Sequence, residues 1–324
     1  MTASNSPERQ CKDEMLMDSD RAVLSVSTCA KAIICGEHAV LYGSPAVSIP
    51  LSAQRMKLTG RVCRPGEEEQ ILFGRKAVSP NVCGLIRDAF NLLSLPEGRL
   101  RLSGSSDIPI GSGLGSSAAL SIATLKLAAS VNGRELHPDQ LAEMGRNLEA
   151  RFHGSSSGLD TATVAWENPI LFHMGQAPVL LRSACGISGG SVLKFCLINS
   201  GVSSSTCAMV QQAKPWFTSP LQGQKRLAAF SGLAAGAAAA MESDDALSLA
   251  EIMNQTHCLL SESGVSAQIL ESMRERILST GALASKITGA GGGGCLLTLL
   301  HPELWQDQLR KIQLLFGNSR VYLA

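Results

Sequence analysis

Apolar residues along the chain recur at two spacings, one typical of strands and one typical of helices. Apolar and small residues alternate at 22–27 and 31–35, and strand-like runs follow at 55–62 and 70–73, which predicts four strands. After Ser79 the spacing changes to every third or fourth position, which predicts a helix capped by the hydroxyl of that serine. The first quarter of the chain is therefore predicted to form strands followed by a helix.

The same two patterns alternate through the remainder of the chain. Ser266 and Gly281 bound one predicted helix as its N-cap and its C-terminal stop. Alternation in both halves predicts a mixed fold of helices and strands in two domains. The small, polar stretch 186–191 is the predicted boundary, which gives a tail at 1–20 and domains at 21–188 and 189–324. Further strands are predicted at 100–102, 168–172, 193–199, 295–300 and near 321, and further helices at 116–131, from 138, from about 206, at 225–241, 244–263 and 266–280, and from 302.

Composition restricts the classes of function. The 324 residues carry a net charge of +1, and only 4% of them are aromatic, so neither an overall positive field nor stacked aromatic side chains favour nucleic-acid binding. No apolar run is long enough to form a membrane helix. Ten cysteines without a Cys-x-x-Cys pair, and an N-terminus without an apolar leader, favour free thiols in the cytoplasm.

A glycine-rich segment, 108–120, lies between a predicted strand and a predicted helix. Gly111, Gly113 and Gly115 alternate there, and a loop of this kind before a helix N-terminus binds phosphate in many proteins. The residues alone equally allow a simple chain-reversing turn. A Walker A loop is excluded because the chain has no Gly-Lys pair, and the dinucleotide fingerprint is excluded because Ser116 stands where its third glycine would be.

Three further segments contain candidate chemistry. Glu37 and His38 lie in a turn between two glycines, where we expect them to face a cleft rather than an apolar core. Asp160 could serve catalysis or simply cap the helix that follows it. The glycine run within 286–294 resembles a flexible linker, but a loop whose backbone must approach a phosphate or another glycine loop explains its position between two strands better.

Taken together, these motifs resemble the GHMP small-molecule kinases. Pro-x-Gly-x-Gly-Leu-Gly-Ser-Ser-Ala-Ala at 109–119 is similar to the central motif of that family. The segments 30–46, 153–160 and 286–295 resemble other family motifs, in the form found in mevalonate kinases. The first motif lacks the Glu-His-x-Asp-Tyr pattern that galactokinases carry. The matches follow the family order and span most of the chain.

The resemblance implies an α+β fold, with a left-handed β-α-β unit in the N-terminal domain and a ferredoxin-like C-terminal domain. It implies transfer of a phosphoryl group from ATP to mevalonate, with Asp160 as catalytic base, Lys31 beside it, and Mg²⁺ held by Ser117 and Glu149. Its nucleotide site would consist of Lys31, Ser106, Gly111, Ser112, Gly113, Leu114, Gly115, Ser116 and Ser117, and its acceptor site of Glu37, His38, Thr206, Ala290 and Gly291.

Departures from the family pattern leave alternatives open. Cys29 and the pair Ser155-Ser156 replace residues common in the family, although none of these changes removes a functional group. Phosphomevalonate or homoserine is an alternative acceptor, and a silent sensor that binds ligands without turnover is an alternative class. The joint presence of Lys31, Ser117, Glu149 and Asp160 argues against a sensor, which needs no base. A homodimer is a possible assembly.

Overall fold

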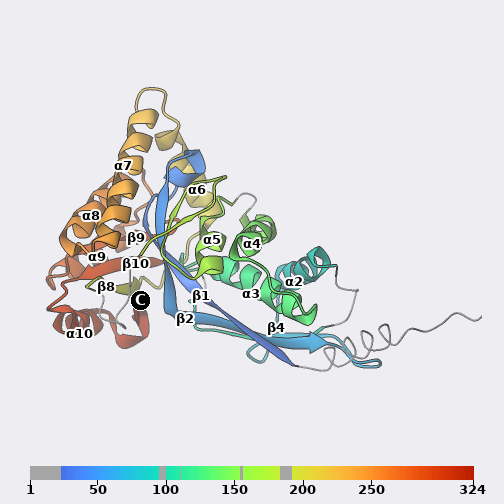
Figure 1. Cartoon of the computed structure of the whole chain (residues 1–324). Helices are drawn as coiled ribbons and strands as arrows, with labels where there is room; N and C mark the ends of the chain where they lie inside the picture. Colours follow the sequence, from blue (N-terminus) through green and yellow to red (C-terminus); the bar gives the residue numbers. More distant parts are fainter. Residues whose placement is uncertain (1–22, 95–99, 110, 154–155, 183–191) are drawn as a thin grey trace, which may run out of the picture.

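Two sheets that contact each other form the framework of the protein (Figure 1). The computed structural model describes residues 23–94, 100–109, 111–153, 156–182 and 192–324. The predicted tail 1–20 and the predicted boundary at 186–191 lie outside these residues. None of the helices in the described parts is both long and apolar enough to cross a membrane.

The first sheet contains seven strands within the described residues, in the order β4-β3-β5-β2-β6-β7, with β1 paired to β2 beside this row. Strands β3 and β5 run parallel, and helix α2 (Pro80–Leu92) lies between them in the chain, which makes the β-α-β connection that the resemblance implied. The strands are β1 (Leu24–Cys35), β2 (Ala46–Val62), β3 (Gln70–Phe73), β4 (Lys76–Ala77), β5 (Leu100–Ser106), β6 (Ile170–Phe172) and β7 (Val179–Leu180).

Strand β1 is one long strand where the sequence pattern predicted two short ones. The alternating pattern breaks at Thr28 because every residue from Thr28 to Cys35 is buried. Helices α3 (Ser116–Val131) and α5 (Leu159–Trp166) of the first half and helices α7 (Gly223–Glu242) and α8 (Ala246–Glu262) of the second half all contact β1. The register of the pairing between β1 and β2 shifts between Cys29 and Ala30, in the interval between the two predicted strands.

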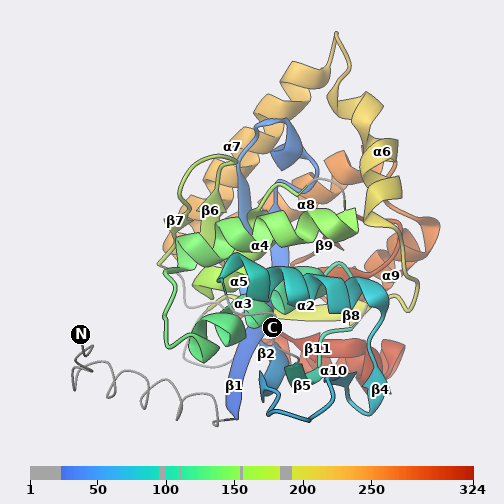
Figure 2. The same ribbon diagram turned by 90° about the vertical axis from the view of Figure 1, so that its right-hand side faces the viewer.

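Helices α2–α5 lie together over the first sheet (Figure 2). Ser79 caps α2 by accepting a hydrogen bond from the amide of Val82, as predicted. Most of α3 is buried, because it packs on β1 and β2 beneath α2 and α4. These helices are α2 (Pro80–Leu92), α3 (Ser116–Val131), α4 (Pro138–His153) and α5 (Leu159–Trp166), and a short turn, η1 (Ala39–Tyr42), follows β1.

The second sheet is antiparallel, in the order β11-β8-β10-β9. Numbered within this half, the order is 4-1-3-2, with one α-helix and a short 3₁₀ turn between the third and fourth strands, which is the ferredoxin-like arrangement predicted. Its strands are β8 (Lys194–Asn199), β9 (Ala284–Thr288), β10 (Cys295–Leu300) and β11 (Val321–Leu323), and its helices are α6 (Thr206–Phe217), α7 (Gly223–Glu242), α8 (Ala246–Glu262), α9 (Gln268–Leu278), α10 (Trp305–Phe316) and the short η2 (Asn318–Arg320).

Four predicted helix starts differ from the structure. Helix α7 begins at Gly223 rather than 225, and helix α8 begins at Ala246 rather than 244. Helix α9 begins at Gln268 with Ala267 at its N-cap, so Ser266 does not cap it. Helix α10 begins at Trp305 rather than Pro302, because the amide of Leu304 first closes a turn on the carbonyl of His301. Residues 302–304 form a turn before α10, whereas Ala267 is extended before α9, and apolar spacing alone does not distinguish such residues from the first helical residues.

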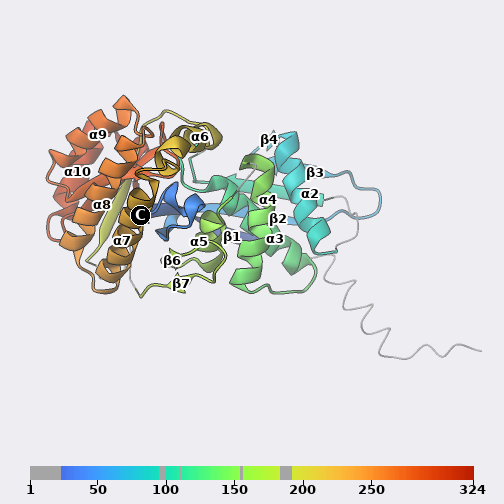
Figure 3. The ribbon, with the colours of Figure 1, turned by 90° about the horizontal axis from the view of Figure 1, so that it is seen from above.

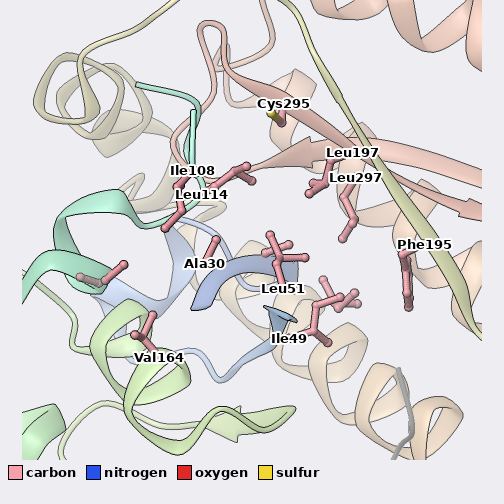
Figure 4. Close-up of a cluster of buried hydrophobic side chains, with 14 of the residues drawn as sticks. Ala30, Ile49, Leu51, Ile108, Leu114, Val164, Phe195, Leu197, Cys295 and Leu297 are labelled. Atoms are coloured by element: carbon pink, nitrogen blue, oxygen red, sulfur yellow. The ribbon is translucent and has the colours of Figure 1, made fainter. Parts of the chain in front are cut away.

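A continuous hydrophobic core joins the two halves, which lie side by side in Figure 3. Ile49 and Leu51 of β2 belong to the same buried cluster as Phe195 and Leu197 of β8 (Figure 4). The amide of Ile33 also donates to Thr288 Oγ1, 2.8 Å away, across the two sheets. Shared burial and this hydrogen bond fix one half against the other, so a site between them has a defined geometry.

Candidate active site

A cavity of about 560 Å³ lies where the two halves meet. Both glycine-rich segments and the ends of β1, α2 and α6 contribute to its wall. Almost every candidate residue lines it, namely Lys31, Glu37, His38, Ser106, Gly111, Ser112, Gly113, Leu114, Gly115, Ser116, Ser117, Glu149, Asp160, Thr206 and Ala290. The fold thus brings residues more than 250 positions apart in the chain to one cavity.

The glycine loop leads directly into the N-terminus of α3. Gly111, Gly113 and Gly115 all have positive φ, at 70°, 78° and 74°, a region that other residues rarely adopt. Gly115 is the N-cap of α3 and has no side chain to cap it. The amides of the first helical turn therefore remain available to a ligand, and the positive end of the helix dipole lies behind them.

The second glycine segment packs backbone to backbone against the first. A Cβ atom on Gly113 would lie 2.7 Å from the carbonyl oxygen of Thr288, and one on Gly289 would lie 2.8 Å from the carbonyl oxygen of Gly113. The amide of Cys295 donates to the carbonyl of Ser112 over 3.1 Å. The expectation of a loop shaped by close approach is confirmed, and the linker interpretation is wrong.

Lys31 and Asp160 form an ion pair in the cavity. Lys31 Nζ lies 3.0 Å from Asp160 Oδ1 and donates to the carbonyl of Gly113 over 3.0 Å. The lysine is 1% exposed, whereas the side chain of Asp160 is 31% exposed. Gly158 is the N-cap of α5, so the carboxylate of Asp160 faces the lysine from the first helical turn instead of capping the helix.

Glu149 provides a second carboxylate in the cavity. Ser117 Oγ donates to its Oε1 over 3.0 Å, and Ser156 Oγ donates to its Oε2 over 2.8 Å. Burial, together with the negative charge of Asp160, raises the pKa of Glu149 to about 7. A buried carboxylate beside a second one is stabilised by a bound cation, and hydroxyl and carboxylate oxygens are the ligands that Mg²⁺ prefers.

The oxygens of Ser117 and Glu149 suit Mg²⁺ better than they suit a metal whose ligands all come from the protein. No three His, Cys, Asp or Glu side chains gather as a metal cluster among the described residues. Magnesium usually keeps several waters and takes one or two carboxylates plus substrate phosphates. Ser117 and Glu149 lie beside the N-terminus of α3, so a metal held there would also be near a bound phosphate.

Glu37 and His38 line the cavity but are buried, contrary to the expectation that the turn keeps them out of the core. They are 1% and 6% exposed. Each has a partner in the second half of the chain, because Lys286 forms an ion pair with Glu37 and His38 Nε2 lies 2.9 Å from the carbonyl oxygen of Ala290. Burial lowers the pKa of His38, so a neutral imidazole donates to that carbonyl.

The remaining acceptor candidates differ in position. Thr206 is the first residue of α6 and lines the cavity. Gly291 is not part of the cavity wall described above. Its carbonyl accepts a hydrogen bond from Ser204, and a Cβ atom at this glycine would lie 2.4 Å from the carbonyl oxygen of Val265. Gly291 therefore shapes the loop behind the cavity.

The sequence pattern did not reveal the apolar part of the wall or the buried Lys286. The apolar residues come from separate strands and helices, and nothing in their local spacing marks them as a shared wall. Lys286 did carry a signal, since it is the one charged residue of a short predicted strand next to an apolar one, and a buried lysine needs a partner. The apolar residues of the cavity wall include Ile33, Met56, Phe73, Val78, Val82, Leu120, Leu159 and Val210.

Curated relatives and family models agree on one family. The model for the N-terminal domain of GHMP kinases matches residues 81–168, and the model for their C-terminal domain matches residues 237–312. A mevalonate kinase of Thermococcus sibiricus is 31% identical, with 90% of this chain and 93% of the relative covered. A mevalonate kinase of Pyrococcus furiosus is 29% identical over the same shares.

Solved structures share the whole fold. Mevalonate kinase of L. major, in complex with R-mevalonate, superposes with a TM-score of 0.79 at 20% identity, covering 94% of this chain and 96% of that one. The mevalonate kinase of Methanococcus jannaschii gives a TM-score of 0.77 at 21% identity, with 94% and 98% covered. Matched over both of its domains and most of its length, the chain belongs to the GHMP kinase family.

Proposed function

We propose that the protein transfers the γ-phosphoryl group of ATP to mevalonate and so forms 5-phosphomevalonate. The observation that carries this proposal is the Lys31–Asp160 ion pair, which lies in the same cavity as the open N-terminus of α3. Phosphoryl transfer to an alcohol needs phosphates held in place and a hydroxyl oriented and relieved of its proton. Relatives named mevalonate kinase, matched over nine-tenths of the chain, support mevalonate as that alcohol.

Lys31 and Asp160 would act on the acceptor hydroxyl. Asp160 would accept its proton as the oxygen attacks phosphorus, because its carboxylate lies in the cavity and is partly exposed. The ammonium group of Lys31 would stabilise the negative charge that develops on the transferred group. Its hydrogen bond to the carbonyl of Gly113 fixes that ammonium against the glycine loop.

The phosphates of ATP would lie against the glycine loop and the first turn of α3. Amides from Gly111 to Ser117 would donate to phosphate oxygens there. Ser117 and Glu149 would hold Mg²⁺, which supplies positive charge to neutralise those phosphates. The apolar side chains Phe73, Val78 and Val82, beside Ser106, provide a surface suited to the adenine ring.

The cavity suits a small acid without a phosphate. Among the described residues that line it, Lys31 is the only lysine or arginine, so a phosphorylated acceptor would find no second such cation. Thr206 brings a hydroxyl and the N-terminus of α6 to the wall, a combination that suits a carboxylate. This distribution favours mevalonate over phosphomevalonate.

The experiment is an assay of ADP release with mevalonate, phosphomevalonate, homoserine and galactose as acceptors. We expect turnover with mevalonate, dependent on Mg²⁺, and mass spectrometry should identify 5-phosphomevalonate as the product. Preference for another alcohol would replace the proposed acceptor. ATP and mevalonate binding without ADP release would support the sensor alternative.

The setting of the enzyme is a further part of the proposal. Cys29, Cys35, Cys196 and Cys295 are buried free thiols, which suits the reducing cytoplasm. We propose no nucleic-acid or membrane partner, and a homodimer as a possible assembly. Sedimentation of the purified protein would measure its mass in solution.

A further inference from the structure

A buried ion pair connects the two halves of the protein beside the cavity. Lys286 lies on β9 and is fully buried, and Glu37 lies in the turn after β1. The ammonium group of Lys286 also donates to the carbonyls of Ile33, 3.2 Å away, and Ile287. One ion pair and two hydrogen bonds to backbone carbonyls therefore hold the ammonium group of Lys286 in place.

Only one oxygen of the Glu37 carboxylate takes part in this pair. Oε1 accepts the hydrogen bond from Lys286, whereas the buried Oε2 has no hydrogen-bond partner among the described residues. Glu37 also lines the cavity. A buried oxygen without a partner is costly, and the cost is removed when a ligand supplies a donor.

The pair is not explained by stability alone. Two buried charges lose as much by leaving water as they gain by attraction, and apolar side chains of similar volume often stabilise a protein equally well. Burial raises the pKa of Glu37, and the charge of Lys286 opposes that rise. The charge of Lys31, on β1, also opposes the rise in the pKa of Glu37. The carboxyl group that pairs with Lys286 thus keeps one oxygen, Oε2, without a hydrogen-bond partner among the described residues at the cavity wall.

We propose that Lys286 is a positioning residue that holds Glu37 so that its Oε2 accepts a hydrogen bond from a hydroxyl group of the acceptor. A carboxylate oxygen accepts but does not donate, so it selects a hydroxyl and repels the carboxylate of the same substrate. Lys286 belongs to the second half and Glu37 to the first. Recognition of the acceptor therefore depends on how the two halves are docked. This proposal rests on the proposed kinase activity.

Three variants separate positioning from support of the fold. Lys286→Met removes the charge and keeps a long apolar side chain. Glu37→Gln keeps the shape and one oxygen but removes the charge. The double variant has neither charge, so no buried ion is left without a partner. Lys311→Met is the matched control, since Lys311 forms an exposed ion pair with Asp307 on α10.

Steady-state kinetics, nucleotide binding and thermal unfolding should be measured on these four variants and on the wild type. We expect Lys286→Met to raise the KM for mevalonate roughly tenfold or more, while the Kd for ATP stays within about threefold of the wild type. The double variant should regain thermal stability relative to Lys286→Met but should not regain the KM. Glu37→Gln should show the raised KM even if Lys286→Met fails to fold.

Recovery of the KM together with stability in the double variant would show that the pair only supports the fold. An equal shift in the constants for ATP and mevalonate would also overturn the proposal. A wild-type enzyme that turns over only another alcohol of the panel would refute mevalonate as acceptor. The same variants compared with that alcohol would then test Lys286 separately.

Discussion

The ammonium group of Lys31 lies 3.0 Å from a carboxylate oxygen of Asp160 and 3.0 Å from the carbonyl oxygen of Gly113. One buried lysine thus connects the candidate base to the candidate phosphate loop. A Cβ atom on Gly115 would lie 2.9 Å from Lys31 Cε, so the loop needs glycine for this lysine to fit. Base, cation and loop form one unit, and a change to one should affect the others.

Replacement of Asp160 tests the base. Asp160→Asn keeps the size of the side chain but removes its ability to take a proton, so kcat should fall roughly 100-fold or more while ATP still binds. Steady-state kinetics and ATP calorimetry would measure both effects. Asp307→Asn, at an exposed position on α10, is the control and should behave like the wild type. Near-normal turnover of Asp160→Asn would leave Asp160 without a catalytic role.

Glu149 should make stability and magnesium affinity depend on pH. Its raised pKa, about 7 against an ordinary 4.5, means that the folded protein retains a proton that the unfolded chain has released. Stability from this group is fully present below about pH 4.5 and is lost as the pH rises to about 7, a total of about 3 kcal/mol. Magnesium should reverse the loss by favouring the ionised form.

Thermal unfolding of the wild type and Glu149→Gln across this pH range would test that expectation. Without Mg²⁺, the stability of the wild type relative to Glu149→Gln should decline from pH 5 to pH 7, and added Mg²⁺ should stabilise the wild type but not Glu149→Gln. Glu275→Gln, at an exposed position on α9, keeps Glu149 and should behave like the wild type in both measurements. Identical magnesium titrations for wild type and Glu149→Gln would place Glu149 outside the metal site.

His38 should support acceptor binding as a neutral group. His38→Ala removes the hydrogen bond to Ala290, and the KM for mevalonate should rise roughly tenfold to 150-fold with little change in ATP binding. His38→Gln, which keeps a donor, should recover part of the loss. Because burial lowers the pKa of His38, imidazole protonation should affect the KM only at a pH below the ordinary histidine range. Equal shifts in both constants would limit His38 to supporting the fold.

Contact between the two glycine loops should be sensitive to a single methyl group. In Gly113→Ala the new Cβ atom would lie 2.7 Å from the carbonyl of Thr288, in addition to about 1–2 kcal/mol of strain at positive φ. Gly133→Ala is the control, because it has a similar φ but no neighbour within 4 Å. We expect Gly113→Ala to unfold at a lower temperature than Gly133→Ala and to bind ATP more weakly. If the two variants unfold at the same temperature and bind ATP equally well, the two glycine loops can move apart without loss of stability or of ATP affinity.

The sequence by itself determined the elements and the motifs. Helix α3 and strands β3 and β10 have the predicted bounds, since glycines and apolar spacing act over a few neighbouring residues. The glycine loop, Lys31 and Asp160 could be named from short motifs because each motif keeps its functional groups within a fixed spacing. Element ends such as Ser266 were less certain, since several neighbouring residues can form the same cap.

Only the tertiary structure decided which groups meet. Glu37 lines the cavity as expected, but its burial was not expected, because its partner Lys286 lies 249 positions away. The single strand β1 and the burial of His38 likewise depend on the second half packing against the first. Local spacing cannot encode such contacts, because burial and pairing depend on which distant residues the chain brings to the same place.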